Sequence, residues 1–153
     1  MAYLFRDPKG KMISILQLDH QPIAGTGTCV DLAKVYAAGL EGRSTKTWRA
    51  GARVIDLTAI PPGVAIATFI EIDGKLVYPG WDGGNHFAFS VRASEKVSGK
   101  STELVVMDQF NSYNGFRGPE ITTRRSGIPA KPRHLKNGKP DMSNDLRYFY
   151  IIE

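Results

Sequence analysis

Three residues of the types that serve in thiol hydrolases stand far apart in this chain: Cys29, His86 and Asp108. A thiolate can attack a carbonyl carbon, an imidazole can move the proton, and a carboxylate can orient the imidazole. The chain holds one cysteine, which excludes an internal disulfide framework and a four-cysteine zinc site. The competing interpretation is that a lone cysteine is a small, buried apolar residue.

The residues before Cys29 predict that a helix begins there. Gly25 and Gly27 provide a flexible approach without side-chain bulk. Thr28 is a good N-cap, because its hydroxyl can accept a hydrogen bond from a free backbone N–H group. Asp31 follows at the capping-box spacing, where it stands in for the more usual Glu.

Apolar residues then recur with helical spacing, so we expect a helix over 28–40 that ends near Gly39 or Gly42. In that helix Cys29 is the first residue. Its sulfur would lie near unpaired N–H groups and the positive end of the helix dipole, which favour the thiolate.

The segment 86–92 has the alternation of a β-strand that begins at His86. One face carries small residues beside His86, which would allow a neighbouring element to approach closely. The other face is the expected core face, and its residues are Phe87, Phe89 and Val91.

The segment 103–110 is predicted to be the next strand, joined to 86–92 by a hairpin centred on Val97. That register places His86 directly opposite Asp108, so both side chains would point to one face. A carboxylate there would fix the imidazole tautomer and support its cationic form. A slip of one residue would replace Asp108 by one of its chain neighbours.

Further strands are expected over 64–70, over 75–78 after an Asp-Gly turn, and over 147–152. The segment 111–140 is rich in Gly, Pro, Asn and basic residues, and is expected to be a loop or insertion. One helix packed on an antiparallel sheet gives an α+β fold, and 153 residues fit a single domain over 1–153.

The net charge of +5 is concentrated in the segment 117–139, which has seven basic residues and one acidic residue. Such a segment could meet an anionic partner, or it could be a solvated loop. No nucleic-acid-binding motif or aromatic platform accompanies it, so we expect no nucleic-acid partner.

No apolar run is long enough for a membrane span, and the first residues lack the pattern of a signal peptide. We therefore expect no membrane partner, and a non-classical route if the protein acts outside the cytoplasm. His20 and His134 are interpreted as solvated loop residues. The histidines and the cysteine lack the spacing of a zinc site, so no metal or other cofactor is expected.

Four residues near the expected nucleophile and base are candidate substrate contacts. Trp81, beside Asp82, either forms a wall of the substrate site or packs under its glycine-rich loop. Asn111 is a further polar candidate near the site. The four substrate-binding candidates are Thr28, Trp81, Asn85 and Gln109.

Four segments in this order resemble the CHAP and NlpC type of papain-like cysteine amidases. They are Thr28-Cys29-Val30-Asp31-Leu32, residues 62–69 after a Pro-Gly turn, Gly84-Asn85-His86 with the strand that follows, and residues 105–110. The resemblance implies a helix packed on a small antiparallel sheet and cleavage of amide bonds in peptidoglycan peptides. By position, Cys29 matches the family nucleophile, His86 the base and Asp108 the orienting residue. The chain departs from the pattern at Asn85, before His86, and at Val64, where the family has Asp.

The chain length and its last residues resemble a small bacterial branch related to amidase effectors of the type VI secretion system. This implies a secretion machinery or a cognate inhibitor protein as partners. It also implies synthesis in the cytoplasm and action in the periplasm or on a target cell.

Two classes of function remain open from the sequence. One is a cysteine amidase, and an acyltransferase or deamidase would use the same three residues. The other is a non-catalytic binding module, with the basic 117–139 segment contacting an anionic polymer and Cys29 only structural.

Overall fold

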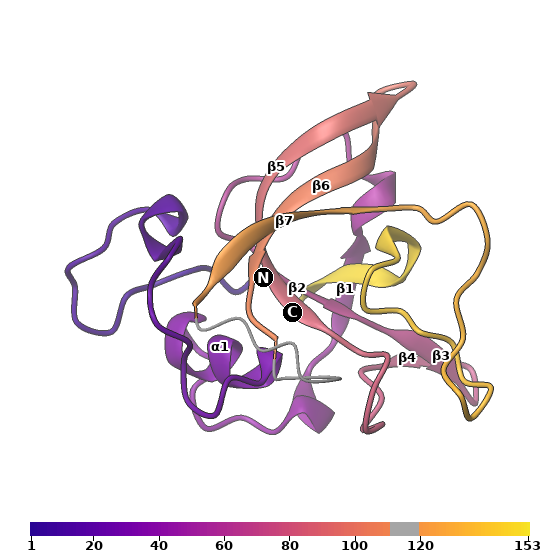
Figure 1. Ribbon diagram of the computed structural model, residues 1–153, viewed down its shortest axis with the longest axis horizontal. Helices are drawn as coiled ribbons and strands as arrows, with labels where there is room; N and C mark the ends of the chain where they lie inside the picture. Colours follow the sequence, from indigo (N-terminus) through magenta and orange to yellow (C-terminus); the bar gives the residue numbers. More distant parts are fainter. Residues whose placement is uncertain (111–119) are drawn as a thin grey trace.

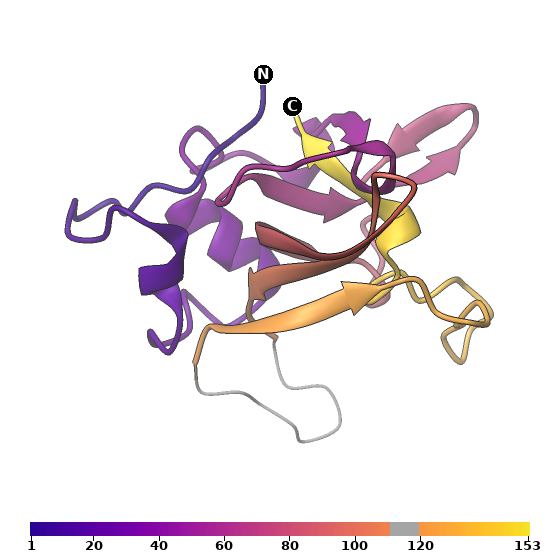
Figure 2. The same ribbon diagram turned by 90° about the horizontal axis from the view of Figure 1, so that it is seen from above.

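The computed structural model describes residues 1–110 and 120–153. Its centre is a six-stranded antiparallel sheet in the order β1-β8-β2-β5-β6-β7, with the helix α1 beside it (Figures 1 and 2). The α+β class and the antiparallel sheet agree with the prediction. The sheet strands are β1 (Ala50–Arg53), β2 (Ala65–Thr68), β5 (Phe87–Val97), β6 (Lys100–Asp108), β7 (Thr122–Gly127) and β8 (Phe149–Ile152).

A separate hairpin joins β3 (Ile70–Ile72) to β4 (Lys75–Val77). Its turn residues Asp73 and Gly74 both have positive φ, at 51° and 78°. This confirms the predicted Asp-Gly turn, since such turns need positive φ at both central residues. Short 3₁₀ helices complete the described elements: η1 (Ile15–Leu18), η2 (Thr45–Thr47), η3 (Val54–Asp56) and η4 (Leu146–Tyr148).

The helix α1 spans Cys29–Tyr36, so it begins where predicted but ends before Gly39. The N-terminal segment causes the early end, because it takes over the backbone groups of the next turn. The Arg6 N–H donates to the Tyr36 carbonyl (2.7 Å), and the Ala38 N–H donates to the Leu4 carbonyl (2.9 Å). Ala37 is already extended, with ψ at 108°.

Both faces of the sheet are covered. Phe87 and Phe89 lie in a core cluster with residues of α1, as the predicted core face requires. The opposite face is also buried, because Ala88 and Val106 lie in a second core cluster with residues of η3 and η4. The start of β5 therefore has no solvated face, which the alternation did not predict.

The register of the β5–β6 hairpin differs from the prediction. Its turn follows Val97, which pairs with Lys100, and bulges interrupt the ladder further along. Near the site Ser90 lies opposite Val106. If this register is continued along the strands, the residue opposite Asp108 is Ala88 and not His86. The error is two residues. Because side chains alternate with a period of two, an even slip keeps both residues on one face.

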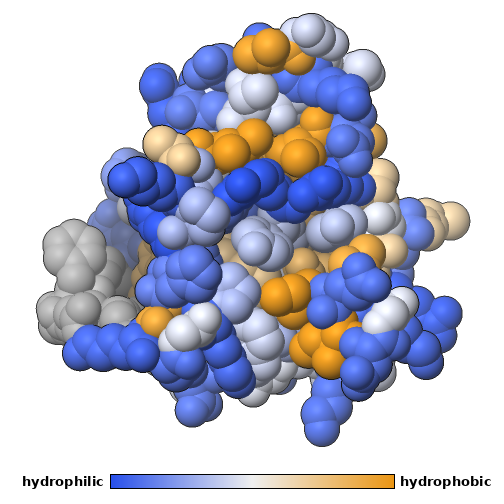
Figure 3. Space-filling view, turned by 90° about the vertical axis from the view of Figure 1, so that its right-hand side faces the viewer, coloured by the Kyte–Doolittle hydropathy of each residue, from blue (hydrophilic) through white to orange (hydrophobic). Residues whose placement is uncertain are grey.

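The expected loop over 111–140 contains the edge strand β7, which pairs with β6. Its sequence is polar and shows no alternation, so long-range pairing and not local pattern forms it. The side of the molecule that lies on the right in Figure 1, near β3 and β4, faces the viewer in Figure 3. Its surface is largely hydrophilic, with hydrophobic side chains in small groups. None of the helices in the described residues has the length and apolarity to cross a membrane.

Candidate active site

Cys29 is the first residue of α1, and the loop before it is held by local hydrogen bonds. The Thr28 hydroxyl accepts from the Asp31 N–H (3.2 Å), as an N-cap should. The Asp31 carboxylate turns instead to Thr26, accepting from its N–H (2.7 Å) and its hydroxyl (2.6 Å), so the second half of the capping box is not formed. These bonds, with that hydroxyl first, lower the pKa of Asp31.

Gln109 fastens the same loop to the sheet. Its carbonyl oxygen accepts from the Ala24 N–H (2.7 Å), and its amide donates to the carbonyls of Ala24 (2.9 Å) and Thr28 (2.7 Å). The side chain is buried, and its polar groups are used within the protein. Gln109 therefore positions the Cys29 loop, and because it also lines the cleft, its role as a substrate contact stays a prediction.

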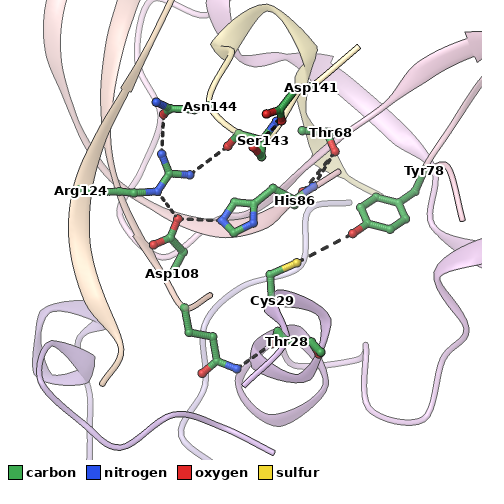
Figure 4. A network of polar contacts seen from close by, with 11 residues as sticks. Thr28, Cys29, Thr68, Tyr78, His86, Asp108, Arg124, Asp141, Ser143 and Asn144 are labelled. Carbon is green, nitrogen blue, oxygen red and sulfur yellow. Dashed lines mark hydrogen bonds and ion pairs between the residues drawn. The ribbon is translucent and has the colours of Figure 1, made fainter. Parts of the chain in front are cut away.

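His86 immediately precedes β5 and is buried. Its ring nitrogen Nε2 lies 2.7 Å from Asp108 Oδ2, and its backbone N–H donates to the Thr68 hydroxyl (2.8 Å). The bond to Asp108 leaves Nδ1 as the ring nitrogen available to Cys29, which lies beside the ring (Figure 4). The structure thus brings the three residues predicted from the sequence into one place.

The Cys29 thiol lies in surroundings that favour its ionised form. Burial opposes the charge, but the imidazolium of His86, a hydrogen bond with that ring, the Phe87 N–H and the Tyr78 hydroxyl together lower the pKa of Cys29. Tyr78 Oη is 4.0 Å from Cys29 Sγ. Burial, followed by the nearby thiolate, raises the pKa of Tyr78, so its hydroxyl stays protonated and can donate.

His86 is correspondingly held in its cationic form. Burial alone would lower its pKa, but the Cys29 thiolate and the hydrogen bond to Asp108 raise it to about 9. A thiol with a lowered pKa beside an imidazole with a raised pKa favours the thiolate–imidazolium pair over the neutral pair. That state is the nucleophile and proton donor of thiol chemistry.

A fourth residue, Arg124, contacts this group from β7. Its Nε donates to Asp108 Oδ2 (2.5 Å), the same oxygen that His86 contacts. The Phe110 ring stacks on the His86 ring, with centroids 4.6 Å apart and an angle of 9° between the planes. The Arg124 guanidinium also lies 5.0 Å from the Phe110 centroid, so this ring packs against both partners of Asp108.

A cleft of about 930 Å³ opens onto Cys29 and His86. Its walls come from the start of α1, the segment 42–45, the glycine-rich loop 79–85 and the C-terminal segment around Asp141. In the described residues, no group of three or more His, Cys, Asp or Glu side chains could hold a metal ion.

Residues 10–117 match the family described as "Domesticated amidase effector 2", and the matched stretch contains Cys29, His86 and Asp108. The chain belongs to this family. Among solved structures, one titled "Type 6 secretion amidase effector 2 (Tae2)" is similar, with a TM-score of 0.69 and 24% sequence identity. The similarity covers 99% of this chain and 94% of that one, and it shows the shared fold. No curated protein matches the sequence.

The other residues predicted as substrate contacts in this family member lie at different places around the cleft. Trp81 lines the cleft, with Lys139 Nζ 4.6 Å from the centroid of its ring. Asn85 also lines it, but its amide donates to the carbonyls of Pro79 (2.5 Å) and Trp81 (3.2 Å) and so closes the loop. Thr28 reaches the cleft as the cap of α1.

His20 and His134 are not among the residues that line the cleft. His20 is exposed and bonds to Glu120 (2.9 Å), and His134 is exposed near Pro140. The Asn111 candidate and Arg117, at the start of the basic segment, lie outside the described residues of this family member.

Two residues that contact the group of Cys29, His86 and Asp108 were not predicted from the sequence. Tyr78 ends the return of a hairpin, and nothing in its local pattern points toward Cys29. Arg124 was counted only as part of the basic 117–139 segment. The order of the strands and their register place both residues, and no local signal in the chain reports either property.

Proposed function

We propose that this chain is a cysteine amidase that hydrolyses amide bonds in peptidoglycan peptides. The observation that carries the proposal is the placement of Cys29 at a helix N-terminus beside a buried His86, whose Nε2 is bonded to Asp108. We further propose a papain-like arrangement of the CHAP and NlpC type. A nucleophile opening a helix, a base opening a strand and an acid on the adjacent antiparallel strand support that placement.

In the proposed first step, the Cys29 sulfur attacks the carbonyl carbon of the scissile amide. The C–N bond breaks as His86 Nδ1 gives its proton to the leaving amine, and a thioester remains. The Cys29 backbone N–H is one of the first four of α1, which have no partner within the helix, so it can donate to the developing oxyanion.

In the second step, His86 takes a proton from water, and the hydroxide attacks the thioester carbon. The carboxylic acid product leaves, and Cys29 and His86 return to the ionised pair. Asp108 holds the imidazole with Nε2 turned away from the sulfur throughout, so the same nitrogen serves both steps.

The cleft suits a peptide that carries both signs of charge. Lys34 and Arg43 line it on the side of α1 and its following segment, whereas Asp82 and Asp141 line it on the opposite loops. Stem peptides of the wall carry free carboxylates and amines, so each sign has a counterpart in the substrate. The family name, amidase effector, agrees with this substrate class.

We propose that the protein acts in the periplasm or on the wall of a target cell, after delivery by a type VI secretion machinery. A cognate inhibitor protein that covers the cleft would protect the producing cell. The family name and the similar solved structure support both points.

The alternative of a binding module built on the 117–139 segment is less favoured. Arg124, one of its basic residues, is committed to Asp108, and Lys139 lies over Trp81 at the cleft. These two basic side chains therefore serve the proposed catalytic site, which leaves fewer charges of the segment to contact a polymer.

The test is digestion of purified peptidoglycan, with mass analysis of the released fragments. We expect native protein to release peptides that gain one water per cleaved amide, and Cys29→Ala and His86→Ala to release none. His20→Ala is the matched control, since it removes an exposed histidine. Equal digestion by native and Cys29→Ala proteins, or by neither, would overturn the proposed hydrolysis.

A further inference from the structure

His86, Asp108 and Arg124 lie on one diagonal line across three neighbouring strands. The β5–β6 register continues to Ala88 opposite Asp108, and β7 places Thr122 opposite Asp108. On the β5 side, His86 therefore precedes the residue opposite Asp108 by two positions. On β7, Arg124 follows the residue opposite Asp108 by two positions. All three side chains share a face, because each offset is even.

Arg124 connects this line to the C-terminal wall of the cleft. Besides Asp108, its guanidinium donates to the Asn144 side chain (2.5 Å) and to the Ser143 carbonyl (3.0 Å) (Figure 4). Ser143 lines the cleft itself. One planar group thus bonds to the acid behind His86 and to the segment across from Cys29, a geometry that a guanidinium can provide and an ammonium cannot.

The charge of Arg124 matters because Asp108 is deeply buried, with 1% of its side chain exposed. Burying a carboxylate costs free energy unless a cation or several donors compensate for the lost water. Oδ2 has two such donors, His86 Nε2 and Arg124 Nε. Without Arg124, Oδ2 would keep one of these two donors, His86 Nε2.

We propose that Arg124 is a positioning residue of the catalytic centre, holding the Asp108 carboxylate in place behind His86 and tying it to the cleft-lining segment 141–144. The role rests on the proposed cysteine amidase. One basic residue of the 117–139 segment, Arg124, would thus act inside the protein. It would do so through Asp108 and without contact to the substrate.

The charged and titratable groups around His86 come from every element packed against it. Cys29 faces it from α1, Asp108 from β6, and Arg124 from β7 through Asp108. Tyr78 lies beyond the sulfur, and Asp141 lines the same cleft. A change at Arg124 should therefore reach His86 through the position of the Asp108 carboxylate, whose hydrogen bond supports the imidazolium.

The experiment measures alkylation of Cys29 by iodoacetamide across the pH range, which needs no substrate. The native rate should show two inflections, from ionisation of the thiol and, near pH 9, from loss of the His86 proton. In Arg124→Gln we expect the upper inflection to fall by about one pH unit. Arg124→Lys keeps a positive donor for Asp108 but not the guanidinium fork, so it should recover only part of that shift.

Arg125→Gln is the matched control, because Arg125 is the next residue of β7, is 70% exposed and lies 3.8 Å from Glu103. We expect its inflections to equal those of native protein. In an Asp108→Asn background, Arg124→Gln should add no further shift, since both changes act through one carboxylate.

An upper inflection that rises in Arg124→Gln, or that does not move, overturns the proposal. A rise would mean that Arg124 acts directly as a nearby positive charge, and no movement would mean a purely structural brace. If Arg124→Gln does not fold, Asn144→Ala decides, because it removes one bond to the guanidinium at an exposed residue and should lower the inflection by less. If native protein alkylates with a single inflection at an ordinary thiol pKa, the proposed ion pair itself fails.

Discussion

The His86 imidazole meets the Asp108 carboxylate across a diagonal of the sheet, with Nε2 2.7 Å from Oδ2. Directly opposed residues would place the two groups side by side on one row of the sheet. The diagonal instead lets the ring lie against Phe110, which occupies the facing position, and leaves Nδ1 toward Cys29. The carboxylate thus selects which nitrogen handles the proton.

Changing Asp108 separates its charge from its orienting role. Asp108→Asn keeps the shape but loses the charge that supports the imidazolium, so we expect hydrolysis at pH 8 to fall about tenfold. Asp108→Ala loses both and should cost on the order of 10²–10⁴-fold. Steady-state hydrolysis of peptidoglycan fragments measures both. Equal losses in the two variants would show that the charge carries the whole effect.

The pH dependence of hydrolysis follows from the two perturbed groups. Cys29 has a lowered pKa, so activity should already rise below the pH at which an ordinary thiol ionises. His86 has a pKa raised to about 9, and the leaving amine needs its proton, so activity should fall as pH rises through about 9. Initial rates in buffers of constant ionic strength check both limbs.

The ionisation of Cys29 can be followed separately by its alkylation with iodoacetamide over the same pH range. Alkylation of glutathione is the control for this reagent, because that thiol has no imidazole beside it. A Cys29 profile that coincides with the glutathione profile would contradict the assigned ionisation.

Removing the Tyr78 hydroxyl should raise the pKa of Cys29, because the thiolate loses a donor. In Tyr78→Phe we expect hydrolysis near neutral pH to fall about three- to fivefold and the acidic limb to move to higher pH. The ring still packs against Trp48, with centroids 5.0 Å apart, so unfolding should be little affected.

Tyr150→Phe is its matched control, since both rings make an edge contact with Phe69, at 5.9 Å for Tyr150 and 6.4 Å for Tyr78. A shift of the acidic limb in Tyr150→Phe as well would point to packing and not to the hydroxyl.

Replacing Gln109 should loosen the loop that carries Cys29. Gln109→Met leaves backbone groups of Ala24 and Thr28 without their partners, so we expect the free energy of unfolding to fall by about 2–4 kcal/mol. Alkylation of Cys29 should slow as well. Chemical denaturation and alkylation kinetics measure the two effects, with exposed Gln21→Met as the control. Unchanged alkylation in a folded Gln109→Met protein would refute the bracing role.

Gly25 should be intolerant of a side chain for two separable reasons. Its φ is 54°, and an added Cβ would lie 2.6 Å from Asp31 Oδ2. Gly10 has a similar φ of 67° with no atom within 4 Å of that position, so Gly10→Ala measures backbone strain alone. We expect about 1 kcal/mol of destabilisation in Gly10→Ala and at least about 1 kcal/mol more in Gly25→Ala.

Denaturant unfolding compares the two glycine variants, and slower alkylation is expected only in Gly25→Ala, because Asp31 orders the loop before Cys29. The same loss of stability in both variants would show that the loop moves away from Asp31 at no cost.

Several features could be predicted from short stretches of the sequence. The start of α1 at Cys29 depends on Thr28, whose hydroxyl acts within one turn, and the Asp73-Gly74 turn depends on its own two residues. The residue types that could do thiol chemistry were also evident without coordinates. Such features are local, because a cap or a turn is stabilised by groups only a few residues apart.

The tertiary structure decided everything that depends on which strands are neighbours and in what register. It turned the pairing of His86 and Asp108 into a diagonal, formed β7 from a stretch without strand pattern, and brought Arg124 and Tyr78 to the site. It also gave Gln109 a bracing position through contacts 85 residues away in the chain. Bulges and long-range pairing set these relationships. The free energy that stabilises them comes from the packed sheet as a whole, so no short stretch of the sequence predicts them.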